Sequence, residues 1–394
     1  MNTSSRNGLG LLRRDLLKGA MVASVVVPQA MRSAQAQTGG DLIAYVGCRT
    51  TKERNARGEG ICVYRIDGKT GEWRQIQLLR DIVNPSYLAF DRKGRNLYSV
   101  HGDFGEASAY SINPRTGEIA LLNKQDCGGK NPVHLTPDQT NRFMLVANYA
   151  TGTLGALPIN DDGSLGTLAT NIAIPGQPGP HKTQQKSIQP HQIPYDPTGR
   201  FLVVPDKGGD KVSVFRFDPD KPAFIPNEPA SVKGREGAGC RHIAFHPSKP
   251  IAYLANELDS TITTYAWDAG KGVLKPLQIV PATPQEFTED NTAAGIATSA
   301  DGRFLYVSNR GHDSISVFAI DQGNGLLKPE SWVSTGGKQP RFFAIDPSGN
   351  HLYAANEVSD TIVDLTIDKQ TGRLAPTGQI IRTGSPTCIV FRQI

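Results

Sequence analysis

The stretch that decides the fold is QPRFFAIDPSGNHLYAANE, residues 339–357, which continues as DTIVDL at 360–365 and TGRL at 371–374. A short apolar run is followed by a D-P-S-G turn and by a second run rich in apolar and aromatic residues. A polar turn then leads to an alternating run, and a T-G turn leads to a fourth run. Because alternation with a period of two marks strands, the stretch predicts four consecutive antiparallel strands.

The same unit recurs along the chain, and its first strand is marked by an anchor residue that is usually proline. The anchors are Pro85, Pro132, Pro190, Cys240, Ala293, Pro340 and Pro386. They lie 47, 58, 50, 53, 47 and 46 residues apart. Four-stranded units at this period are typical of propeller blades, and no segment shows the sustained helical period of about 3.6 residues.

The two ends of the chain predict how the ring closes. Residues 41–46 form a run of the second-strand type with no first strand before it, and residues 385–391 form a lone run of the first-strand type. One blade built from both termini would close the ring and remove the exposed sheet edges. We therefore expect an all-β protein, a seven-bladed β-propeller that spans residues 37–394 as one domain.

Residues 1–36 have the features of an export signal. Arg13 and Arg14 form a twin-arginine pair, an uncharged stretch covers residues 19–27, and residues 34–36 read AQA, a small-x-small cleavage site. A membrane anchor is the alternative, but the apolar stretch is much shorter than the roughly 20 residues that span a bilayer. We expect export along the twin-arginine route, cleavage of this signal, and a periplasmic or secreted mature protein.

Charge and cysteines limit the classes of function. The whole chain carries a net charge of +5, and residues 1–36 hold five basic residues and one acidic residue, so the mature chain is near +1. A nearly neutral surface gives no electrostatic reason to bind nucleic acid. The five cysteines show neither a C-x-x-C pair nor metal-ligand spacing with histidine. We interpret them as buried small side chains, with one unassigned disulfide left open, and we expect no metal and no cofactor.

Strand order predicts which side chains meet at one mouth of the central channel. The first strand of a blade is innermost, and its start lies beside the end of the second strand because the two form a hairpin. The residues after the anchors are Ser86, Val133, His191, Arg241, Ala294, Arg341 and Thr387. The second strands end at His101-Gly102, Asn148-Tyr149, Asp206-Lys207, Asn256-Glu257, Asn309-Arg310 and Asn356-Glu357. The ionisable residues that meet at this mouth are the candidate site, namely His191, Arg241, Glu257, Arg310 and Arg341.

Each candidate also has a purely structural interpretation. Arg241 and Arg341 could pair with the glutamates that end the second strands and so staple blades together. His191 could line the channel without taking part in chemistry. The loop of residues 171–189 reaches the same face and carries Lys182, which could meet an anionic substrate or only solvate the loop.

Several segments resemble the propeller-type lactonase family. They include RHIAFHP at residues 241–247, NEL at 256–258 and SNRGHDSI at 308–315, and the resemblance covers nearly the whole mature chain. That family contains bacterial 6-phosphogluconolactonases and fungal carboxymuconate lactonizing enzymes. Many members carry an acidic residue and a histidine where this chain has Gly295 and Ala297. The resemblance therefore implies a lactonase without specifying its lactone.

The resemblance implies roles for the residues at the mouth, with His191, Arg241 and Glu257 as the catalytic set. Glu257 or His191 would act as general base on water. Arg241 would stabilise the oxyanion. Apart from the resemblance, the chemistry of the mouth makes Arg310 or Arg341 the expected anchor for a carboxylate or phosphate of the substrate, and Lys182 is a further candidate for substrate binding.

The function that follows from the resemblance is hydrolysis of a sugar-type lactone, as in 6-phosphogluconolactonase, by a carboxylic ester hydrolase with a small-molecule substrate. No G-x-S-x-G elbow is present in the sequence, which argues against a serine-triad hydrolase. The alternatives are a lactonizing cycloisomerase acting on a carboxymuconate and a non-enzymatic periplasmic binding or scaffold propeller. We expect a monomer that, once the signal is cleaved, binds neither nucleic acid nor membrane.

Overall fold

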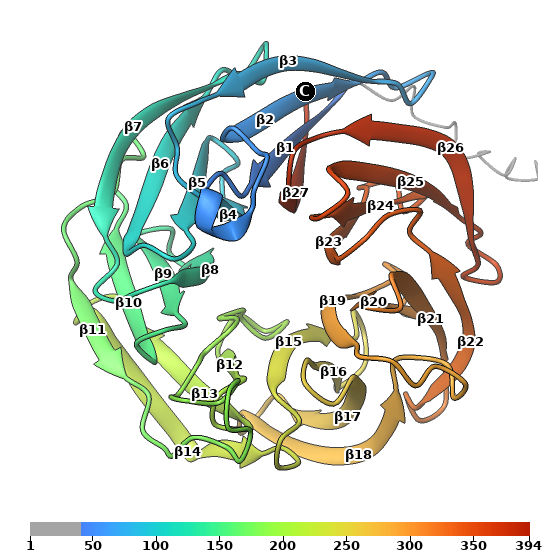
Figure 1. Cartoon of the computed structure of the whole chain (residues 1–394). Coiled ribbons are helices and arrows are strands. Elements are labelled where there is room, and N and C mark those ends of the chain that lie inside the picture. Colours follow the sequence, from blue (N-terminus) through green and yellow to red (C-terminus); the bar gives the residue numbers. More distant parts are fainter. Residues whose placement is uncertain (1–40) are drawn as a thin grey trace, which may run out of the picture. The chain divides into compact units, whose positions relative to one another are not determined.

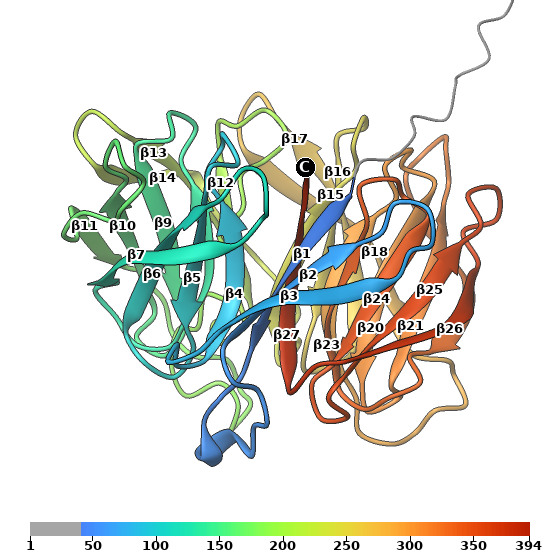
Figure 2. The same ribbon diagram turned by 90° about the horizontal axis from the view of Figure 1, so that it is seen from above.

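Seven sheets arranged around a centre make up the computed structural model, which describes residues 41–394 (Figure 1). This arrangement confirms the predicted β-propeller. Strands run between the two faces of the disc, and a short helix, η1 (Lys52–Arg54), projects from one face (Figure 2). The expected export signal, residues 1–36, lies outside the described residues. Along residues 41–394, the structure has no helix of the length and apolarity that crossing a bilayer requires.

The blade that closes the ring is built from both ends of the chain, as predicted. Its strands, from the centre outward, are β27 (Pro386–Gln393), β1 (Leu42–Cys48), β2 (Ile61–Ile66) and β3 (Trp73–Leu79). β27 and β1 pair antiparallel, from Leu42 opposite Gln393 to Cys48 opposite Pro386. The C-terminal strand therefore supplies the innermost strand of the blade that the N-terminal segment begins.

Five further blades have four strands each, in chain order from the centre outward. They are β4 (Pro85–Phe90), β5 (Asn96–His101), β6 (Glu106–Ile112) and β7 (Ile119–Asp126); β8 (Pro132–Pro137), β9 (Phe143–Asn148), β10 (Thr153–Pro158) and β11 (Thr170–Ala173); β15 (Cys240–Phe245), β16 (Ile251–Asn256), β17 (Thr261–Asp268) and β18 (Val273–Pro281); β19 (Thr292–Thr298), β20 (Phe304–Arg310), β21 (Ser314–Ile320) and β22 (Leu327–Ser334); and β23 (Pro340–Ile345), β24 (His351–Asn356), β25 (Thr361–Ile367) and β26 (Leu374–Arg382).

One blade departs from the prediction. It has three strands, β12 (Leu202–Asp206), β13 (Lys211–Asp218) and β14 (Ala223–Lys233), and its expected first strand is reduced to isolated bridges at Pro190 and Tyr195. Pro194 explains this, because it has no N–H to donate to a ladder, whereas an anchor proline such as Pro190 also begins regular strands in other blades. The backbone N–H of His191 still donates to the carbonyl of Pro205 at 2.9 Å. His191 therefore keeps its innermost place without a regular strand.

A β-bulge follows the anchor of nearly every regular innermost strand. In β4, Pro85 pairs with His101 and Tyr87 with Val100, so Ser86 between them has no partner in the ladder. The same skip leaves out Val133, Arg241 and Arg341, and in β27 it leaves out Thr387. A bulged residue is free to turn away from the sheet. The positions predicted to face the channel mouth are thus set apart by the backbone itself.

The core of residues 41–394 consists of seven clusters of buried side chains, one at each seam between neighbouring blades. Four seams share a polar latch in which a second-strand tyrosine donates to the carbonyl of a turn glycine in the next blade. The pairs are Tyr45 with Gly117, Tyr98 with Gly163, Tyr253 with Gly325, and Tyr306 with Gly372. Each of these glycines has a positive φ, which the T-G or related turn requires. All five cysteines are buried and free, so none of them forms a disulfide.

Candidate active site

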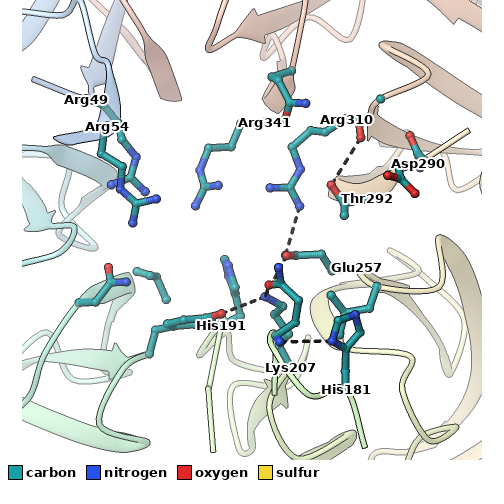
Figure 3. A pocket seen from close by; sticks show the side chains of 18 residues that line it. Arg49, Arg54, His181, His191, Lys207, Glu257, Asp290, Thr292, Arg310 and Arg341 are labelled. Carbon is teal, nitrogen blue, oxygen red and sulfur yellow. Dashed lines mark hydrogen bonds and ion pairs between the residues drawn. The ribbon is translucent and has the colours of Figure 1, made fainter. Parts of the chain in front are cut away.

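The predicted channel mouth is a cavity of about 650 Å³. Figure 3 shows a row of arginines along one side, facing Glu257, Lys207, His191 and His181 on the other. The lining residues are Arg49, Arg54, Asn131, Val133, Tyr149, His181, Gln184, His191, Lys207, Glu257, Leu258, Asp290, Asn291, Thr292, Arg310, Gly311, Gln339 and Arg341. Five of them are Lys or Arg and two are carboxylates, so the cavity favours an anionic ligand.

Glu257 lies at the centre of a buried ion-pair network, which we call the Glu257 cluster: Glu257, Lys207, Arg241 and Arg310. Its Oε1 lies 3.1 Å from Lys207 Nζ, and its Oε2 lies 2.9 Å from Arg241 Nε and 3.2 Å from Arg310 Nη2. All four side chains are at most 10% exposed. Burial alone would raise the pKa of Glu257, but Arg310, Lys207 and Arg241 outweigh it and hold that pKa well below its usual range.

Arg241 lies beneath the cavity rather than in its wall. Its side chain is 2% exposed, and it is not among the lining residues. Besides the bond to Glu257, its Nη1 donates to the carbonyl of Ala294 at 2.7 Å and to His242 Nδ1 at 3.2 Å. Nε and Nη1 are thus committed to protein partners, and through Nε Arg241 holds Glu257 in place.

His191 lines the cavity as an uncharged imidazole. Its ring packs edge-on against Tyr149, with centroids 5.5 Å apart, and against His242 at 5.1 Å. Burial, together with Arg241, Arg341 and Lys207, holds the pKa of His191 well below its usual value. Its Nδ1 is enclosed and makes no hydrogen bond to any residue in the range 41–394. Nε2 is therefore the ring nitrogen left to take part in chemistry.

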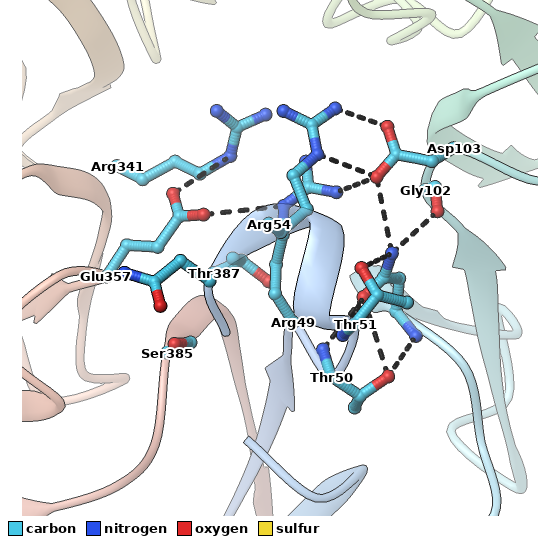
Figure 4. A network of polar contacts seen from close by, with 12 residues as sticks. Arg49, Thr50, Thr51, Arg54, Gly102, Asp103, Arg341, Glu357, Ser385 and Thr387 are labelled. Carbon is cyan, nitrogen blue, oxygen red and sulfur yellow. Dashed lines mark hydrogen bonds and ion pairs between the residues drawn. The ribbon is translucent and has the colours of Figure 1, made fainter. Parts of the chain in front are cut away.

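A second network, which we call the seam cluster, lies on the opposite side of the mouth: Arg49, Arg54, Asp103, Arg341 and Glu357 (Figure 4). Arg49 follows β1 and reaches both neighbouring blades, with Nη1 3.0 Å from Asp103 Oδ2 and Nε 3.4 Å from Glu357 Oε1. Arg54, in η1, donates from Nε to Asp103 Oδ2 at 2.7 Å. Arg341 Nε lies 3.8 Å from Glu357 Oε2. The seam cluster thus ties the blade closed by both termini to the blades on either side.

The structure brings together most of the predicted residues. His191, Glu257, Arg310 and Arg341 line one cavity, and Arg241 supports it from below. The stapling interpretation also has a basis, since Arg241 pairs with Glu257 and Arg341 lies near Glu357. Lys182 is exposed and is not a lining residue, whereas His181 and Gln184 of the same loop are. A binding role for Lys182 stays a prediction that no contact in the structure supports.

Sequence reasoning overlooked Lys207, Arg49 and Arg54. Lys207 follows Asp206 at the end of its second strand, so the repeat placed it at the mouth without giving it a role. Arg49 occupies the equivalent position after β1, and alignment of that strand with the others could have found it. Arg54 lies in η1, outside the repeat, and no sequence signal marks it.

Of the two positions expected to depart from the family pattern, Gly295 lies on the innermost strand β19, and Ala297 of the same strand packs against the buried cluster at a blade seam. The backbone N–H of Gly295 donates to Ser308 Oγ at 2.9 Å, and a Cβ at Gly295 would approach the Phe343 ring within 3.1 Å. A larger residue there would have to displace this ring. Among residues 41–394, no three His, Cys, Asp or Glu side chains lie together in a way that could hold a metal ion.

Comparison with known proteins relates this geometry to a family. Residues 43–391 match the family model described as "Lactonase, 7-bladed beta-propeller". A 6-phosphogluconolactonase of Bacillus subtilis is 35% identical over 308 residues, which cover 78% of this chain and 85% of the relative. A 6-phosphogluconolactonase of Formosa agariphila is 33% identical over 312 residues, covering 77% and 86%.

A solved structure agrees with these sequence matches. The periplasmic gluconolactonase of Pseudomonas aeruginosa superposes with a TM-score of 0.82 at 31% identity. The match covers 89% of this chain and 99% of that protein. The similarity thus extends around the whole ring.

Proposed function

Because this chain belongs to the lactonase family of seven-bladed β-propellers, we propose that it hydrolyses a sugar-type lactone, as a carboxylic ester hydrolase. One observation carries the proposal: an uncharged imidazole, His191, shares a cavity with the cations Lys207, Arg310 and Arg341. Ester hydrolysis needs a proton acceptor for the attacking water and positive charge for the oxyanion that forms. The cavity offers both.

In the proposed reaction, His191 Nε2 takes a proton from water as the water oxygen bonds to the lactone carbonyl carbon. The carbonyl oxygen becomes an oxyanion facing Lys207 and Arg310. The bond from the carbonyl carbon to the ring oxygen then breaks, and that oxygen takes the proton back from His191. The product is a hydroxy acid, and His191 is again neutral. General base catalysis of this kind contributes roughly 10²–10⁴-fold.

Glu257 is a poor candidate for the base. Both of its oxygens are already paired with cations, so neither is free to take a proton from water. We assign it instead to positioning Lys207 and Arg310, with Arg241 holding it from below. This changes the role expected for Arg241 from contact with the oxyanion to support of the groups that make that contact.

Arg341 is the proposed anchor for an acidic group of the substrate. Its guanidinium lines the cavity and is only loosely paired, which suits two-point binding of a carboxylate or phosphate. The curated relatives are named for a phosphorylated lactone and the periplasmic structure for an unphosphorylated one. Both lactones therefore belong in the test.

The test offers the purified protein δ-gluconolactone, its 6-phosphate and a carboxymuconate, and follows acid release. We expect the lactones to open, and His191→Ala, Arg241→Ala and Glu257→Ala to lower the rate. Ring opening that survives all three substitutions would remove the proposed site. A ring-closed product from the muconate would instead support the cycloisomerase, and no turnover of any substrate would support a binding propeller.

We also propose that residues 1–36 direct export and that the enzyme acts outside the cytoplasm as a monomer. The twin-arginine pair and the AQA site support this, and a structural relative is named as periplasmic. Cell fractionation should find the mature protein in the periplasm or medium. Lys at both Arg13 and Arg14 should leave the uncleaved chain in the cytoplasm; unchanged export of that variant would refute the route.

A further inference from the structure

The guanidinium of Arg341 lines the cavity, and little negative charge lies close enough to neutralise it. It is the bulged residue of β23, and its Nε lies 3.8 Å from Glu357, beyond hydrogen-bond distance. That carboxylate is shared with Arg49, whose Nε is nearer at 3.4 Å. Figure 4 shows both terminal nitrogens of Arg341 directed away from Glu357. Two N–H groups in one plane are the arrangement that binds two oxygens of a single anion.

His191 shares the cavity with this guanidinium and is surrounded by positive charge. Arg241 and His242 face it from β15, Arg341 from β23, Lys207 from the end of β12, and Tyr149 from the end of β9. Each cation disfavours protonation of the imidazole because a second positive charge would then lie beside it, and burial disfavours protonation further. In the unliganded site, these surroundings therefore keep His191 neutral, and for the same reason they make it a weak base.

We infer that an acidic group of the substrate, bound by Arg341, activates His191 by offsetting the positive charge around it. The inference rests on the proposed function and deepens it. The bound anion would thus increase the rate of the chemical step and not only the affinity for the substrate. An anionic lactone should therefore have a higher kcat as well as a lower KM than a neutral lactone. With a neutral lactone bound, His191 remains a weak base.

The physical basis is the relation between base strength and rate. A general base works best when its pKa lies near the working pH, and the free site holds the pKa of His191 far below that. An anion at Arg341 cancels one of the charges responsible, so the imidazole accepts a proton more readily in the transition state. Because the effect is electrostatic, the anion need not be attached to the lactone.

The experiment supplies the two parts separately. The whole protein is given δ-gluconolactone, which is neutral, at fixed pH and ionic strength, with added phosphite dianion, acetate or chloride, and the rate without enzyme is subtracted. We expect phosphite or acetate to raise kcat/KM saturably, by about tenfold or more, and chloride to have no effect. A response to phosphite alone identifies a phosphoryl group as the natural activator, and a response to acetate alone identifies a carboxylate.

Two variants locate the effect. Arg341→Gln should abolish the activation, so that the rates with and without the anion become equal. Arg80→Gln removes an arginine whose side chain is 60% exposed and lies outside the cavity, and should keep the full activation. Activation that persists in Arg341→Gln would place the anion elsewhere and overturn the inference.

Failure of the inference differs from failure of the proposed function. If δ-gluconolactone is opened but the anions have no effect or compete with it, the lactonase proposal stands and the activation does not. If neither this lactone nor its 6-phosphate is opened, both fall.

Discussion

The Glu257 cluster and the seam cluster share one cavity and are built from the same kinds of residue, yet they differ in burial and in charge balance. The Glu257 cluster sets three cations around one carboxylate, all at most 10% exposed. The seam cluster sets three cations around two carboxylates, and its exposure rises to 45% at Arg54. A surplus of buried positive charge is costly, and sites that keep such a surplus usually bind an anion.

The difference separates the Glu257 cluster, which serves chemistry, from the seam cluster, which apart from Arg341 serves assembly. Arg49, Asp103 and Glu357 come from three neighbouring blades and nearly balance, as expected of a fastening between blades. The Glu257 cluster leaves positive charge for a ligand to complete. Three substitutions can break or sharpen this contrast.

The largest effect is expected for Glu257→Gln. The change leaves three buried cations without their shared carboxylate, and breaking a buried pair costs about 3–5 kcal/mol. Urea denaturation should show a loss of this size, and lactone hydrolysis should fall with it. A stability close to that of the native chain would mean that Lys207, Arg241 and Arg310 do not depend on Glu257.

His191→Gln should separate activity from stability within the same cavity. The imidazole makes no side-chain hydrogen bond to the described residues, so its loss should cost much less stability than that of Glu257. If His191 is the base, kcat should fall by roughly 10²–10⁴-fold. The control is His246→Gln, which alters a buried histidine whose Nε2 bonds to Gly302, away from the cavity. That variant should keep its turnover.

Asp103→Asn should have the smallest effect, because the side chains of Asp103 and Arg54 are 28% and 45% exposed and the buried Arg49 keeps its second partner, Glu357. Partly exposed ion pairs contribute about 1 kcal/mol or less. Turnover should change little, since Asp103 does not line the cavity. A loss as large as that of Glu257→Gln would erase the distinction between the two clusters.

Acid titration of this last variant tests the sign of the interaction. Burial raises the pKa of Asp103, but Arg54 and Arg49 outweigh it and lower the pKa below its ordinary value. A lowered folded pKa contributes stability above the unfolded pKa of about 3.9 and loses it as pH falls through the folded value. The gap between native chain and Asp103→Asn should therefore be full at neutral pH and close in acid.

Much of the fold could be predicted because its signals are local. Turn residues and period-two alternation fix each strand, and the unpaired runs at residues 41–46 and 385–391 fix closure. The irregular segment after Pro190 could not be predicted from the anchor pattern, since the proline that marks other first strands is joined there by Pro194. The repeat pattern predicts the strands that the blades have in common, but it does not predict the irregular first strand of a single blade.

The site could be predicted in part for the same reason. His191, Glu257, Arg310 and Arg341 occupy repeat positions, so topology alone placed them at the mouth. Depth could not be read in this way: Arg241 shares its repeat position with Arg341 but lies below the cavity. The loop that carries Lys182 has no hydrophobic periodicity from which the direction of its side chains could be predicted. In the structure, His181 and Gln184 line the cavity, and Lys182 does not.

The bulges have a consequence for how such proteins diverge. A residue left out of the ladder can be exchanged without breaking strand hydrogen bonds, so each of the four blades begun by β4, β8, β15 and β23 carries one mouth position whose side chain can change while its strand pairing is kept. Ser86, Val133, Arg241 and Arg341 illustrate the range such positions accept. In a propeller of this kind, selection for a new lactone can therefore replace one residue at the channel mouth while the strand pairing of the other blades is retained.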